Sequence, residues 1–180
     1  MPDLRSVPDE TKWRIATQYA VHLTALYESV VRPVLQDRYN ELEQEIWIRM
    51  AQFSSEIARS LALPVETARD LAGSLRLVNT LFFGPEYKDE IIGLGDDRAV
   101  IIIRICPSLM SDSSSSSSCE GTFHRCMAFT LASQKCMNPG YSSRFVRAMC
   151  MGDRQCEITI EPDKGPEKKP ALKNPITPRT

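Results

Sequence analysis

The chain has 180 residues, which is enough for one sizeable core and short for two ordinary domains. Its 22 Lys and Arg nearly balance its 23 Asp and Glu, so no overall field attracts a polyanion, and nucleic acid is excluded as a partner. No stretch reaches the roughly 18 apolar residues of a membrane span, and the N-terminus is too polar for a signal peptide. We therefore expect a cytoplasmic protein without a membrane span.

Apolar side chains at three- and four-residue spacing predict a helical half over residues 1–84. One helix covers residues 9–31, a second begins at Pro33 and ends near Ala62, and a third restarts at Pro64 and ends at Gly84. The stripe of the first helix contains Trp13, Ala16, Ala20, Leu23, Tyr27 and Val30. Such a stripe either packs on its own domain or forms a partner-binding face, and we favour packing.

In the middle of the chain the helical spacing of apolar residues stops. Residues 85–97 are acidic and are typical of a turn-rich connection, whereas residues 98–105 (RAVIIIRI) predict a strand that is buried on both sides. Alternation places Arg104 on the side of Ile102 and Cys106. An arginine at this position requires a partner, which is a bound anion, an intramolecular salt bridge or solvent at a surface strand end.

All six cysteines lie between Cys106 and Cys156. In a reducing compartment, clustered thiols serve metal binding, reactivity or core packing rather than a disulfide framework. Ser117 and Glu120 have the spacing of a capping box, which places Cys119 in the first turn of a helix, where the dipole favours a thiolate. Cys119 is therefore the candidate nucleophile, with His124 as candidate base, unless Cys119 is only a small packing residue.

A β-hairpin is predicted at the end of the cysteine-bearing region. Residues 144–150 and 156–160 alternate in polarity, and Gly152 and Asp153 lie between them. In this hairpin Cys150 and Cys156 are cross-strand neighbours, at a spacing that suits two ligands of one ion or a disulfide. Residues 1–161 are expected to form one domain. The proline-rich tail, residues 162–180, is flexible alone or orders against a protein partner.

The run from Cys150 to Ile160, CMGDRQCEITI, resembles the C-terminal hairpin of the 4-vinyl reductase domain family. With Cys106-Pro107 and the helix around Cys126, residues 98–161 also resemble the cysteine-containing proteins grouped with L-2-amino-thiazoline-4-carboxylic acid hydrolases. The resemblance implies an α+β fold in which long N-terminal helices pack on a small antiparallel sheet, as in a transport-particle subunit family that holds acyl chains. It also implies a site made by Cys150 and Cys156, with Cys106 and Cys126 as further members.

Three functions are compatible with these patterns. The first is a small-molecule-binding or regulatory module in which Cys106, Cys126, Cys150 and Cys156 hold zinc, with an iron–sulfur cluster or no cofactor as alternatives. The second is a cysteine-dependent hydrolase of a small thiazoline-like or thioester substrate, with Cys119 or Cys126 as nucleophile, His124 as base and Arg104 as a carboxylate anchor. The third is an accessory subunit that docks on a larger complex. A homodimer through the N-terminal helices fits all three.

Overall fold

The structure is a computed structural model that describes residues 3–112 and 119–165, and the side chains of residues 110–120 are not described. Within these ranges the elements, in chain order, are η1 (Leu4–Ser6), α1 (Asp9–Leu35), α2 (Asp37–Ser60), α3 (Ala68–Phe83), β1 (Lys88–Leu94), β2 (Arg98–Ile105), α4 (Pro107–Asp112), α5 (Cys119–Met137), β3 (Tyr141–Arg147), η2 (Met149–Met151) and β4 (Cys156–Pro162). The predicted α+β class, with long N-terminal helices and a small antiparallel sheet, is confirmed. None of the described helices combines the length and the apolar character that crossing a membrane requires.

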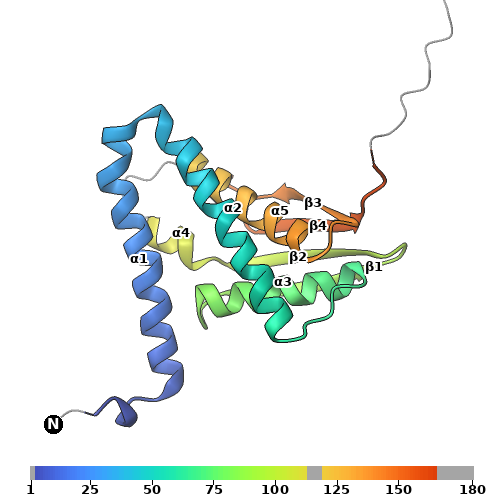
Figure 1. Cartoon of the computed structure of the whole chain (residues 1–180), viewed down its shortest axis with the longest axis horizontal. Coiled ribbons are helices and arrows are strands. Elements are labelled where there is room, and N and C mark those ends of the chain that lie inside the picture. The colour runs from blue at the N-terminus through green and yellow to red at the C-terminus, as the bar shows by residue number, and fades with distance from the viewer. Residues whose placement is uncertain (1–2, 113–118, 166–180) are drawn as a thin grey trace, which may run out of the picture.

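The four strands form one antiparallel sheet in the order β1-β2-β4-β3. Ile101 in β2 lies between Ile91 of β1 and Ile158 of β4. Alternate side chains of the central strands pack with those of α3 into the core, whose fully buried members include Ala99, Ile101, Ile158, Ile160, Leu71 and Leu75. Figure 1 shows α1 at one edge of the molecule, beside α4, with the sheet on the opposite side. The core thus lies between the sheet and α3, and α1 is peripheral to it.

The third helix is where the sequence prediction is closest. Helix α3 starts after Thr67, whose hydroxyl accepts a hydrogen bond from the Asp70 N–H (3.1 Å). It ends at Gly84, which has a φ of 89° and donates its N–H to the Thr80 carbonyl. A hydroxyl cap before the helix and a glycine after it are the two strongest boundary signals in a sequence.

Two predictions about the first two helices are wrong. Pro33 does not begin the second helix but lies inside the last turn of α1, where a proline removes only one backbone hydrogen bond. The chain reverses at Gln36, which has a φ of 49°. In addition, Leu23, Tyr27 and Val30 do not pack on the domain but are exposed. The periodicity showed that these residues share a helix face and carried no information about what covers it.

The C-terminal half also differs from prediction in two places. Residues 88–94 are not a turn-rich connection but form β1, because every residue of this segment pairs with β2. The hairpin of β3 and β4 is confirmed, but its register pairs Arg147 with Glu157, and Cys150 lies in η2. Cys150 and Cys156 are therefore not cross-strand neighbours. Helix α5 covers Cys119–Met137 of the described residues, and the predicted capping residue Ser117 lies outside them, so the start of this helix stays a prediction.

Candidate functional site

A buried ion network joins α1, α2 and α5. Arg125 of α5 donates to Glu28 of α1 (Nη1–Oε2, 2.7 Å) and to Glu43 of α2 (Nη1–Oε1, 3.0 Å). Arg32 binds the same two carboxylates from the other side, at 2.8 Å from Glu28 and 3.6 Å from Glu43. The side chains of Arg125, Glu28 and Glu43 are all at least nine-tenths buried. Among the described residues, two arginines face two glutamates, so the network fixes the three helices relative to one another through paired charges.

Tyr39 completes this network. Its hydroxyl donates to Glu43 (3.2 Å), and its ring lies under the Arg32 guanidinium, 4.3 Å from ring centroid to Cζ. Burial raises the pKa of the Tyr39 phenol, and the nearby charges of Glu43 and Glu28 raise it further. The phenol therefore stays protonated and acts as a hydrogen-bond donor to the carboxylate.

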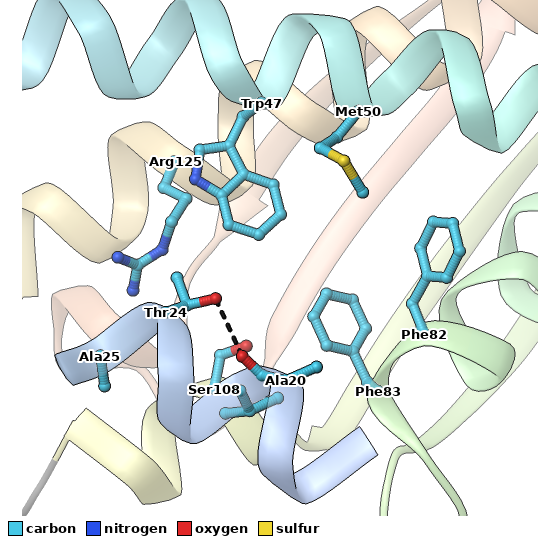
Figure 2. A pocket seen from close by; sticks show the side chains of 10 residues that line it. Ala20, Thr24, Ala25, Trp47, Met50, Phe82, Phe83, Ser108 and Arg125 are labelled. Carbon is cyan, nitrogen blue, oxygen red and sulfur yellow. Dashed lines mark hydrogen bonds between the residues drawn. The ribbon is translucent and has the colours of Figure 1, made fainter. Parts of the chain in front are cut away.

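An outer cavity of about 190 Å³ lies beside the network. Figure 2 shows Trp47 and Met50 reaching into it from α2, Phe82 and Phe83 from α3, and α1 forming the opposite wall. Ala20, Thr24 and Ala25 make up most of that wall, and the Thr24 hydroxyl donates to the Ala20 carbonyl (3.0 Å). Among the side chains that the structure describes, Arg125 is the single charged member of the lining, so the cavity is suited to apolar groups.

An inner cavity of about 60 Å³ lies between α3, α5 and the sheet. It shares Trp47, Phe83, Ser108 and Arg125 with the outer cavity, so the two are neighbouring chambers. Its wall includes four of the six thiols, those of Cys106, Cys126, Cys150 and Cys156. Both volumes are below the roughly 300–1,000 Å³ of typical small-molecule pockets. The chambers therefore give no support to the expected small-molecule-binding module.

Two thiols of the inner cavity, those of Cys126 and Cys156, are held in their protonated form. Burial raises the pKa of Cys126 well above its usual value, and the neighbouring thiols Cys106, Cys150 and Cys156 add to this while Arg125 opposes it. Burial also raises the pKa of Cys156 to about 11, although the Met149 N–H donates to its sulfur (3.3 Å) and acts in the opposite direction. Because the thiolate is the nucleophile and the metal ligand, these two side chains are weakly reactive at neutral pH.

The expectation of a metal-binding, zinc-containing protein is wrong for the part of the chain that the structure describes. Among those residues no three His, Cys, Asp or Glu side chains are placed to hold a metal ion. Tetrahedral zinc requires four sulfurs that converge at about 2.3 Å from one centre. Four thiols can line the same cavity without meeting this requirement.

The other predicted site residues are Arg104, His124 and Cys119. Arg104 is exposed at the end of β2, where it pairs with Glu90 and donates to Gln155, so the structure gives it intramolecular partners. His124 is half-buried on α5 beside Phe123, with ring centroids 6.1 Å apart. The side chain of Cys119 lies outside the described residues, so its role as nucleophile remains a prediction.

Sequence reasoning missed the ion network altogether. One signal was available in α1, where Glu28 shares the buried face with Thr17 and Ala25. A carboxylate on the packed face of an amphipathic helix requires a cation. Its partner Arg125 is 97 positions away, and no local pattern connects the two.

The comparisons with known proteins bear on the fold. Neither a protein-family model nor a curated protein matches the chain. A solved structure that does match is the crystal structure of a trafficking protein particle complex subunit 3 from Naegleria fowleri, covalently bound to palmitic acid. The likeness has a TM-score of 0.57 at 14% sequence identity and covers 82% of this chain and 97% of that chain. It shows the fold alone.

This likeness refines the implications of the sequence resemblance. The fold shared with transport-particle subunits is confirmed, while the more specific resemblance to 4-vinyl reductase domains gains no support. The hydrolase-like interpretation also gains no support, because the similar structure is described as a subunit of a trafficking complex.

Proposed function

We propose that this chain is a subunit of a multiprotein assembly and that it docks through the exposed side of α1. The observation that carries the proposal is a continuous apolar stripe on that helix, which we call the α1 face. Its members, with their exposed fractions, are Ile15 (57%), Tyr19 (68%), Leu23 (38%), Leu26 (58%), Val30 (62%) and Val34 (78%). A row of exposed large apolar side chains of this length marks an interaction site.

The geometry of α1 keeps this face on one side of the helix. The spacings between successive members are four, four, three, four and four residues, so the pattern of Ile15, Tyr19 and Leu23 repeats after 11 residues. At about 100° per residue all six positions fall within an arc of about 100°. The buried residues Thr17 and Glu28 lie on the opposite side. The α1 face is therefore not excess core surface but a second, separate apolar side of the helix.

A protein partner explains this face better than a lipid surface does. Helices that lie on membranes carry Lys and Arg on their polar side, which bind anionic headgroups. Residues 15–27 of α1 contain no Lys, Arg, Asp or Glu. The likeness to a trafficking complex subunit also supports a protein partner, since that protein is by its description part of a complex.

The occupant to which the proposal commits is a second copy of this chain. An uncharged helix face can pack against its own copy without bringing like charges together, and two-fold symmetric contacts are the commonest in homo-oligomers. An 11-residue repeat, at 3.67 residues per turn, is close to the natural helical period, so two such helices would pack nearly straight along the whole face. The expected N-terminal homodimer thus acquires a defined surface.

The test is the mass of the full chain in solution, measured by light scattering and sedimentation over a range of micromolar concentrations. We expect the wild type to be a dimer, and the double substitution Tyr19→Glu with Val30→Glu to make it monomeric. The matched control is Gln18→Glu with Ser29→Glu, which adds the same charges one residue earlier, at exposed polar positions about 100° around the helix. Circular dichroism confirms that all variants fold.

Two outcomes would count against the proposal. A wild-type chain that is monomeric at all concentrations would rule out a second copy as the occupant. A dimer that is weakened equally by both double substitutions would show that added charge matters and the α1 face does not.

A further inference from the structure

Tyr87 carries a buried hydroxyl group whose hydrogen bonding is incomplete. The residue is 5% exposed, and its ring stacks on Phe83 with centroids 5.8 Å apart. The side chain lines the inner cavity, where Asn79 is a polar neighbour of its hydroxyl, but no hydrogen bond of standard geometry joins this hydroxyl to any residue that the structure describes. More than 90% of buried polar groups have a partner in the protein or in ordered water. Such a hydroxyl at a cavity wall therefore indicates a bound guest.

The size of the inner cavity restricts that guest. Its volume is about 60 Å³. A water molecule occupies about 30 Å³ in the liquid and needs two to four polar partners, so the space suits about two water molecules. Larger organic molecules would have to displace the packed side chains of the wall.

The wall supplies the polar partners that ordered water needs. Besides Tyr87, the buried side chains of Asn79, Thr122 and Thr130 line the same cavity. Burial raises the pKa of Tyr87 well above its usual value, the charge of Asp89 adds to this, and the side chain of Asn79 lowers it. Asn79 of α3 is therefore close to the phenol, which stays neutral and can donate one hydrogen bond. The wall also contains Ser108 and Arg125, whose guanidinium is already bound to Glu28 and Glu43, and is otherwise apolar or thiol. A charged guest would therefore lose most of its hydration without compensation.

We propose that the inner cavity is a hydration site that holds about two ordered water molecules, one of which accepts a hydrogen bond from Tyr87 Oη. The water connects Tyr87, which precedes β1, to Asn79 on α3. It enters from the outer cavity, since Trp47 and Phe83 line both chambers. This inference is independent of the proposed docking function, because none of these residues belongs to the α1 face.

The experiment combines a crystal structure of the full chain, at a resolution that shows ordered water, with the substitution Tyr87→Phe. The matched control is Tyr27→Phe, which removes the hydroxyl of an exposed tyrosine. We expect density for water within hydrogen-bond distance of Tyr87 Oη. We also expect the folding equilibrium constant of Tyr87→Phe to fall roughly three- to tenfold, the effect of one hydrogen bond, and that of Tyr27→Phe to stay unchanged.

Two results would overturn the proposal, and one would support it. If the cavity is dry, the hydroxyl has no partner in the folded protein and Tyr87→Phe is at least as stable as the wild type, which would overturn the proposal. Density for an organic molecule in place of water would also overturn it. Water in the cavity together with a loss of stability confined to Tyr87→Phe would support it.

Discussion

Replacing Arg125 by Met tests whether the buried ion network holds the helices together. Methionine keeps most of the apolar stem and removes the guanidinium, which leaves Glu28 and Glu43 with Arg32 as their remaining cation in the network. Breaking a buried pair in this way costs about 3–5 kcal/mol, because an uncompensated charge stays in the interior. For a chain of this size each kcal/mol lowers the melting temperature by about 2–4 °C, so the expected decrease is about 6–20 °C.

The assay is urea unfolding followed by far-ultraviolet circular dichroism, with the midpoint and the slope fitted separately. Arg49→Met is the matched control, since Arg49 pairs with Glu45 at 2.8 Å but on the exposed surface of α2. An exposed pair of this kind contributes about 0.3–0.5 kcal/mol. Glu28→Gln added to Arg125→Met should restore part of the loss, because it removes one of the two unbalanced carboxylates. Equal, small effects of Arg125→Met and Arg49→Met would refute the reasoning.

Three further predictions concern the turns and the thiols. Gly84→Ala should destabilise the protein by about 1–3 kcal/mol, because the φ of Gly84 is 89° and a Cβ there would lie 2.3 Å from an α1 hydroxyl oxygen. Gly73→Ala should stabilise the protein by about 0.5–1 kcal/mol, because Gly73 lies in α3 and a Cβ there would meet open space. Urea unfolding measures both effects. Hydrogen bonds from a tyrosine hydroxyl and from the first N–H of α3 lower the pKa of Asp97. Asp97→Asn should therefore reduce the melting temperature at pH 7. The reduction should shrink as the pH falls below 3.8, the usual pKa of an aspartate side chain. In the native protein, peptide mapping should find alkylation of the exposed Cys136 far faster than of Cys156, whose thiol is buried with a raised pKa.

The fold could be predicted from the sequence where local signals set it. The capping residues Thr67 and Gly84 mark the two ends of α3, and the run of β-branched residues in β2 identifies the central strand. The segment 88–94 could not be predicted in this way, because its strand conformation comes from pairing with β2 rather than from its own acidic, glycine-containing composition.

The site was harder to predict, because its parts come from distant segments. Arg125 meets Glu28 and Glu43 across 97 and 82 positions. The clustering of cysteines predicted thiol chemistry, yet burial raises the pKa of Cys126 and Cys156 and keeps both thiols protonated. The α1 face was visible in the sequence only as a periodicity, which buried helices and docking helices share.

A row of aromatic side chains connects the surface of α2 to the inner cavity. This row determines which positions are suitable for the substitutions of the docking experiment. Phe53 is exposed on α2 and stacks on Phe82 with centroids 6.0 Å apart. Phe82 in turn contacts Phe129, which is buried in the wall of the inner cavity, at 6.1 Å. Since closely packed interiors transmit displacements, a charge placed at Phe53 would disturb the core together with any interface. Tyr19 and Val30 on α1 lie outside this chain of contacts, so a loss of dimer after their substitution would report on the α1 face itself.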